Sequence, residues 1–126
     1  MQDSTTKRIL QLEGALVLFM SILLFKDSSY SWWLFAGLFF LPDALLLGYL
    51  LSSVVGANLY NLSHSYSIPL LLGALLLRQS PQHLPLVLIW TAHIGFDRML
   101  GYGLKLQKGF RFTHLGVIGK ANSVNL

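Results

Sequence analysis

The stretch Leu84-Pro-Leu-Val-Leu-Ile-Trp90-Thr-Ala-His93-Ile-Gly-Phe-Asp97-Arg98 carries most of the information about this fold. Its first half is almost entirely apolar, and its second half holds a histidine, an aspartate and an arginine. His93 and Asp97 are four residues apart, so on a helix their side chains lie on one face, about one turn from each other. Ionisable groups at membrane depth usually pair, line a cavity or bind a ligand. The stretch therefore predicts a membrane helix with a polar site.

Composition agrees with a membrane location. Of the 126 residues, 54% are hydrophobic and only 11% are charged, whereas soluble domains carry roughly 25% charged residues. Apolar runs long enough to cross a bilayer recur along most of the chain, and the length suits one compact unit. We expect a multi-pass integral protein of the cell membrane, with the lipid bilayer as its surroundings.

The residue types also exclude several functions. The chain has no cysteine, which excludes disulfides, thiolate nucleophiles and cysteine-ligated metals. The net charge of +4 would suit a nucleic-acid-binding protein. Here, however, the basic residues gather near the ends of apolar segments, where they set membrane orientation. We expect no nucleic-acid partner.

Four apolar segments predict an all-α fold, an antiparallel four-helix bundle in the membrane. They lie at residues 9–25, 31–52, 54–77 and 84–104. Pro69 is expected to bend the third segment. The transmembrane domain is thus 9–104, with a cytoplasmic N-terminal segment at 1–8 and a basic cytoplasmic tail at 105–126 that lies on the anionic leaflet.

The distribution of lysine and arginine predicts the orientation of the bundle. The two ends of the domain carry Lys7, Arg8, Lys105, Lys108 and Arg111, whereas the opposite side has only Lys26 and Arg78. Because lysine and arginine favour the cytoplasmic side, we expect both termini in the cytoplasm.

The costly polar residues of the four segments fall at similar depths. With roughly 1.5 Å of rise per helical residue, the expected depths from the cytoplasmic side are about 6 Å for Glu13, 13 Å for Asp43, 10 Å for Asn61, 15 Å for His64, 16 Å for His93 and 10 Å for Asp97. Independent accidents would scatter in depth. The sequence therefore predicts one polar layer inside the bundle.

Such a layer suits a metal site. Imidazole and carboxylate donors without thiolate are typical of zinc, manganese or iron, and helix bundles build such sites from inward residues on facing helices. We expect Asp43, His64, His93 and Asp97 as ligands of a divalent metal, with Glu13 or Asn61 in a supporting catalytic role. The ion would supply hydroxide for hydrolysis.

The motifs around these residues resemble an uncharacterised bacterial membrane family, the domain of unknown function family 4260. The resemblance is carried by Pro42-Asp43, Leu47-Gly48-Tyr49, Tyr60-Asn61, His64-Ser65-Tyr66, Pro69, the block from His93 through Lys105, Gly109-Phe110 and Thr113-His114-Leu115-Gly116. It covers residues 10–116 and implies a small four-helix protein of the bacterial inner membrane, with no assigned activity.

A remoter likeness concerns activity. The aspartate after Pro42 and the histidines in later segments are similar to the membrane-bound metal-dependent hydrolases. The Arg-Gly-x-x-His-Ser block expected in that group is reduced here to His64-Ser65. The likeness implies a hydrolase acting on a lipid or lipid-linked substrate.

Three other interpretations remain open from the sequence. His64 and His93 could be axial ligands of a haem, with Gly56, Gly73 and Gly95 admitting the macrocycle. The polar layer could instead be a proton or ion pathway in a transporter or accessory subunit, which four short spans would form as a homo-oligomer. Finally, the polar side chains could only hold the helices together, with Asp97 paired to its neighbour Arg98.

Overall fold

The structure, a computed structural model, describes residues 4–104, 112–113 and 116–117. The described chain is almost entirely helical. Its helices are α1 (Ser4–Lys26), α2 (Trp32–Leu38), the 3-10 helix η1 (Leu41–Leu50), α3 (Ser53–His64), α4 (Ser67–Gln79), the 3-10 turn η2 (Pro81–His83) and α5 (Leu84–Met99). The all-α prediction is thus confirmed for this part of the chain.

Two short strands were not predicted. The strands β1 (Phe112–Thr113) and β2 (Gly116–Val117) form an antiparallel pair. The basic residues of the predicted tail, together with residues 1–3, lie outside the described part of the chain.

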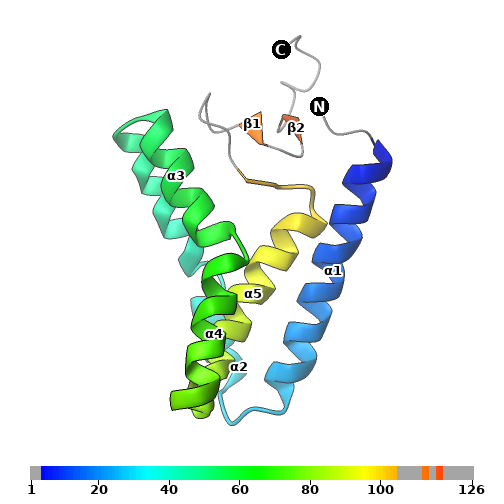
Figure 1. Ribbon diagram of the computed structural model, residues 1–126, viewed down its shortest axis with the longest axis vertical. Coiled ribbons are helices and arrows are strands. Elements are labelled where there is room, and N and C mark those ends of the chain that lie inside the picture. Colours follow the sequence, from blue (N-terminus) through cyan, green and yellow to red (C-terminus); the bar gives the residue numbers. More distant parts are fainter. Residues whose placement is uncertain (1–3, 105–111, 114–115, 118–126) are drawn as a thin grey trace.

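The helices run back and forth along one axis (Figure 1). α1 runs in one direction, α2 and η1 return, α3 and α4 follow the direction of α1, and α5 returns again. We call these four runs the first to fourth passes. α1 packs along α5, α3 packs along η1, and α4 lies against α5. The start of α1 and the end of α5 lie at the same end of the molecule, where Gln11 Nε2 donates to the Met99 carbonyl over 3.3 Å.

Two helical runs are long and apolar enough to cross a membrane. They are Ser4–Lys26 and Trp32–Leu50. In the most apolar stretch of each run, only 17% and 6% of the residues are buried within the structure. Large apolar side chains such as Leu16, Phe19 and Leu50 are more than half exposed. Soluble monomers rarely expose continuous apolar surface on this scale, so these faces suit a lipid environment.

The second pass is divided at a proline. A proline ring clashes with the carbonyl group four residues earlier and lacks a hydrogen-bond donor. The residue four before Pro42 is Leu38, where α2 ends, and Pro42 is the second residue of the 3-10 helix η1. The aspartate that follows the proline therefore lies next to a break in the pass.

The third pass breaks earlier than predicted. Ser65 has extended backbone angles (φ −97°, ψ 140°), so α3 ends at His64 and α4 starts at Ser67. Pro69 therefore lies in the first turn of α4, where its backbone nitrogen would have no helical partner in any case. The prediction that Pro69 bends a continuous helix is wrong.

The helix of the fourth pass, α5, ends at Met99 rather than at the predicted residue 104. Gly101 adopts a positive φ of 93°, its N–H donates to the Arg98 carbonyl over 3.0 Å, and the Tyr102 N–H donates to the Asp97 carbonyl over 2.8 Å. This is the Schellman arrangement, which ends a helix at glycine. Asp97 and His93 therefore lie only about 3 Å and 9 Å from the helix end, nearer to it than predicted.

Glycine pairs hold the passes together. A Cβ added at Gly95 would lie 2.6 Å from the Gly14 carbonyl oxygen, so the backbones of α1 and α5 are in contact there. A Cβ added at Gly48 would lie 3.1 Å from the Cα of Gly56, and one at Gly56 would overlap the Tyr49 ring. Small residues allow such a close approach of helices.

The Gly14–Gly95 contact gives a stability prediction. In Gly95→Ala the new methyl group meets backbone atoms that cannot turn away, so we expect the free energy of unfolding in detergent to fall by about 1–3 kcal/mol. The matched control is Gly37→Ala on α2, where an added Cβ has nothing within 4 Å. That change should be neutral or stabilising by about 0.5–1 kcal/mol. Equal stability of the two variants would contradict the proposed packing.

Candidate metal centre

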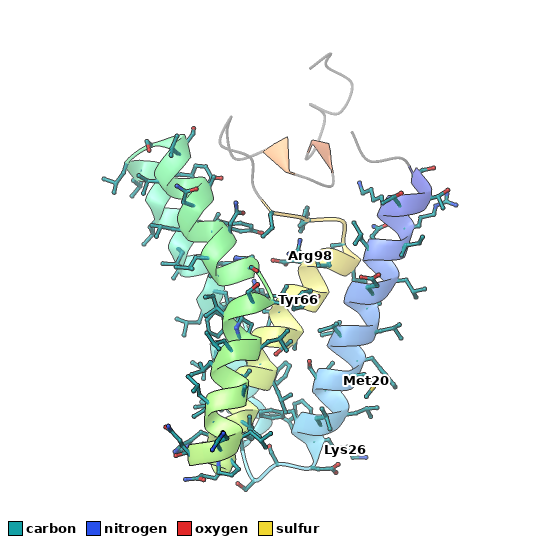
Figure 2. The ribbon with its side chains drawn as sticks, viewed as in Figure 1. Met20, Lys26, Tyr66 and Arg98 are labelled. Carbon is teal, nitrogen blue, oxygen red and sulfur yellow. The ribbon has the colours of Figure 1, made fainter. Side chains whose placement is uncertain are left out.

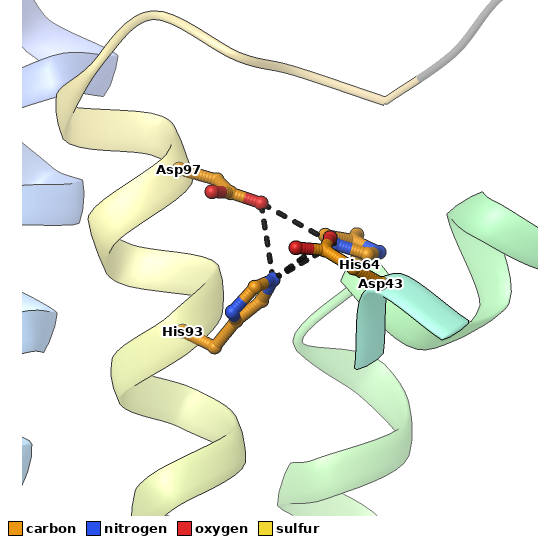
Figure 3. A group of neighbouring side chains, drawn as sticks. All are labelled: Asp43, His64, His93 and Asp97. Atoms are coloured by element: carbon orange, nitrogen blue, oxygen red, sulfur yellow. Dashed lines mark hydrogen bonds and ion pairs between the residues drawn. The ribbon is translucent and has the colours of Figure 1, made fainter. Parts of the chain in front are cut away.

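Four polar side chains converge where three passes meet (Figure 3). Asp43 comes from the first turn of η1, and His64 is the last residue of α3. His93 and Asp97 lie one turn apart on α5. One donor atom from each of the four lies within 4.8 Å of all the others. The structure thus brings together the four residues that the sequence predicted as ligands.

The donor atoms are closely spaced. His64 Nε2 lies 3.0 Å from His93 Nε2 and 3.0 Å from Asp43 Oδ1. His93 Nε2 lies 3.2 Å from the same Asp43 oxygen. Asp97 Oδ2 is 3.3 Å from both histidine nitrogens. Both imidazoles therefore present the same ring nitrogen to both carboxylates.

The cluster is buried on one side and open on the other. The side chains of His64 and His93 are 3% and 1% exposed and that of Asp97 is 14% exposed, whereas that of Asp43 is 36% exposed. Access to the cluster is therefore greatest at Asp43.

The orientation of His64 is fixed by its own helix. Its ring stacks on the Tyr60 ring with centroids 3.7 Å apart and planes 10° apart. Its Nδ1 lies 2.9 Å from the Tyr60 carbonyl oxygen, which can only accept, so Nδ1 carries a proton. In the neutral ring, Nε2 then presents a lone pair to the cluster. A metal-bound histidine is usually oriented in this way by a carbonyl group.

Ser63 connects His64 to the turn that carries Asp43. Its hydroxyl group lies 2.8 Å from His64 Nδ1 and donates to the Pro42 carbonyl over 3.0 Å. This contact ties the end of α3 to the start of η1, which places the aspartate next to the histidine.

Side chains of α5 satisfy the end of α3. The last carbonyl groups of a helix have no partner within it. The Trp90 indole N–H donates to the Ser63 carbonyl over 2.6 Å, and the Arg98 guanidinium donates to the His64 carbonyl over 2.9 Å. Arg98 also lies over the Tyr66 ring at 5.8 Å (Figure 2). Arg98 thus serves the backbone of α3, while Asp97 contacts the two histidines rather than pairing with Arg98.

The sequence did not indicate these two roles. Trp90 and Arg98 act on backbone carbonyl groups, and neither has a spacing motif that marks such a contact. The available signal was the break after His64, because a helix that ends inside a membrane must have its carbonyl groups satisfied elsewhere.

His93 is surrounded by aromatic side chains. Its ring makes edge contacts with Phe39 and Phe40, with centroids 5.2 Å and 6.3 Å away. Its Nδ1 is buried and has no hydrogen-bond partner within the described residues. The polar contacts described for this side chain are therefore those to the cluster.

The two residues predicted in supporting roles lie on different helices. Asn61 is half-buried on α3, three residues before His64, and Glu13 is exposed on α1. Glu13 does not belong to the group of converging donors. Their catalytic roles stay predictions.

A haem does not fit between the histidines. Axial ligands bind from opposite faces of the macrocycle, but the two Nε2 atoms are only 3.0 Å apart. Two of the three glycine positions are also filled, because Tyr49 covers Gly56 and the α1 backbone covers Gly95. The geometry therefore disfavours the haem interpretation.

Comparison with known proteins gives a family. The family model described as Domain of unknown function (DUF4260) matches residues 7–118. The chain belongs to this family. The match contains the whole cluster and confirms the resemblance seen in the sequence. No curated protein and no solved structure matches this DUF4260 chain.

The donor spacing in this DUF4260 protein suits a single ion. Four donors at about 2.0–2.1 Å from a tetrahedral ion lie about 3.3 Å from one another. Five of the six donor separations are 3.0–3.3 Å. An ion could therefore be bound without a large movement of the side chains.

The proton count also favours a cation. The two Nε2 atoms can supply at most two protons, and the carboxylates normally supply none, yet five contacts join these atoms. If both imidazoles were protonated, two positively charged rings would bring their Nε2–H groups together, with the nitrogen atoms 3.0 Å apart. One divalent ion with two carboxylates and two neutral imidazoles is electrically neutral, which suits a buried site.

Proposed function

We propose that this DUF4260 protein is a divalent-metal-dependent membrane enzyme that hydrolyses a lipid or a lipid-linked substrate. Asp43, His64, His93 and Asp97 bind the ion, which is zinc, manganese or iron. The observation that carries the proposal is the set of donor separations of 3.0–3.3 Å among these four side chains.

The proposed setting is an antiparallel bundle of four membrane passes with both termini in the cytoplasm. The common end of α1 and α5, two spanning runs and the apolar outer faces support it. α5 has 16 residues, which is shorter than the roughly 20 that a bilayer core needs. The cluster near its end would therefore lie close to the cytoplasmic surface, where water and a substrate head group are available.

The reaction would take place at the open side of the cluster. A bound divalent ion makes a water molecule acidic enough to supply hydroxide near neutral pH. The side chains of His64 and His93 are deeply buried and that of Asp97 is 14% exposed, whereas that of Asp43 is 36% exposed. A catalytic ion keeps one position open for water, so we infer that Asp43 would give up its position to the water and accept a proton from it as general base, while His64, His93 and Asp97 would hold the ion. Asn61, and less directly Glu13, would support the substrate.

Membrane orientation can be tested with fusions. A phosphatase that is active only outside the cytoplasm should be inactive when fused after Leu126 and active when inserted in the α4–α5 connection, after Ser80. The lysine and arginine distribution gives the reason. The opposite pattern would refute the orientation.

Metal binding is the main test of the proposal. Protein purified without chelators should hold about one divalent ion per chain by elemental analysis, because the four donors fit one tetrahedral ion. His93→Ala should lose the ion, since the carboxylates replace imidazole poorly, and Asp97→Asn should bind it more weakly.

The matched control for metal binding is His83→Ala. His83 lies outside the cluster and contacts Tyr30, so this variant should keep the ion. Folded wild-type protein without metal would overturn the proposal. The cluster would then be interpreted as a proton or ion pathway in a self-associating transporter or accessory subunit.

The rate of hydrolysis distinguishes the predicted role of Asp43 from that of the buried ligands. With phospholipid in mixed micelles, hydrolysis should require the metal. Asp43→Asn should reduce the rate by about 10²–10⁴-fold, the usual contribution of a general base, while keeping most of the metal that His93→Ala loses. If Asp43→Asn kept full activity, the assignment of the base would be wrong.

A further inference from the structure

An apolar groove begins directly beside the cluster. It lies between the second pass and α5 and has a volume of about 490 Å³. Its walls include Leu41, Ala44 and Leu45 on one side and Leu86, Ile89 and Trp90 on the other. Volumes of 300–1,000 Å³ are typical of small-molecule sites.

The groove is lined by chain neighbours of two cluster residues. Pro42 and Ala44, which flank Asp43 in the chain, both line it, and so does Ser63, which precedes His64. Asp43 is also the most exposed of the four donors. A molecule lying in the groove would therefore lie next to the turn that carries this carboxylate.

The polar groups in the groove wall are already used. The Ser63 hydroxyl group donates to the Pro42 carbonyl, and the Trp90 indole N–H donates to the Ser63 carbonyl. The rest of the named lining is aliphatic or aromatic carbon. A polar ligand would lose its hydrogen bonds to water there without replacement, so the part of a ligand inside the groove must be apolar.

We propose that the groove binds one long acyl or alkyl chain of the substrate and places the bond to be cleaved at Asp43. This inference rests on the proposed function and names its substrate class, a chain-bearing lipid with its polar group at the cluster. At about 30 Å³ per atom, the share of a water molecule in the liquid, the groove holds roughly sixteen chain atoms.

A second groove provides a matched control. It has a volume of about 410 Å³ and is lined by Leu72, Leu76, His83 and Val87, together with Leu86 and Trp90, which line both grooves. It is also apolar and also borders α5, but the cluster residues and their chain neighbours are not part of its lining. Nonspecific lipid would enter both grooves, whereas a substrate chain would depend on the groove beside Asp43.

The probe is a long-chain fatty acid with a diazirine on its chain, added to the metal-loaded protein in detergent. Photolabelling should reach the η1 peptide that contains Leu41 and Leu45, which line this groove and not the second one. Ala44→Trp fills the groove from an exposed position and should reduce this labelling by about tenfold. Leu76→Trp, in the other groove, should leave it unchanged.

Competition tests the same groove without any substitution. Excess unlabelled long-chain fatty acid should abolish labelling of the η1 peptide in the wild type, and a short-chain acid should not. Labelling spread evenly over the outer faces of α1 and α4, or insensitive to Ala44→Trp, would mean ordinary lipid contact and would overturn the inference.

Two further readouts distinguish the possible failures. If Ala44→Trp changes the oligomeric state, the groove is an interface between copies of the chain, and the inference is wrong. Metal content is measured on every sample. Specific labelling of a protein that binds no metal would refute the proposed function and the placing of the cleaved bond, whereas metal binding without specific labelling would refute the groove alone.

Discussion

The end of α3 determines much of this structure. Its last two carbonyl groups accept hydrogen bonds from Trp90 and Arg98 of α5, which lets the helix stop at His64 in apolar surroundings. Because the helix stops there, the histidine side chain stands at a helix end and faces both α5 and the start of η1. The same contacts that satisfy the backbone therefore bring the donors of three passes together. Stability and site formation depend on one set of hydrogen bonds.

Close backbone contact between helices provides the second constraint. Gly14 and Gly95 allow α1 and α5 to touch, and Gly48 and Gly56 do the same for η1 and α3. The helices η1, α3 and α5 meet at the cluster, and α4 lies alongside α5. Asp43 reaches the histidines because the Ser63 hydroxyl group binds the neighbouring Pro42 carbonyl. An aspartate after a proline therefore lies at a break in the pass, where it remains partly exposed beside an apolar groove.

The sequence identified the four converging donors because each is expensive in an apolar run. It placed them at one depth, but depth along a helix does not determine the face on which a side chain lies. Glu13 was grouped with them for that reason and is exposed. The early ends of α3 and α5 were missed, since Gly101 was not interpreted as a helix terminator and Pro69 was taken for the bend. Trp90 and Arg98 bind backbone carbonyl groups, for which sequence spacing carries no signal.

The order of the donors along the chain has a consequence for biosynthesis. Asp43 is synthesised first, His64 follows 21 residues later, and His93 comes 50 residues after Asp43. Until α5 has been synthesised and packed in place, the aspartate and the first histidine have neither their α5 partners nor the side chains that satisfy the end of α3. The final helix therefore completes the assembly, and a nascent chain interrupted before it would carry an unsatisfied helix end and an unfinished site.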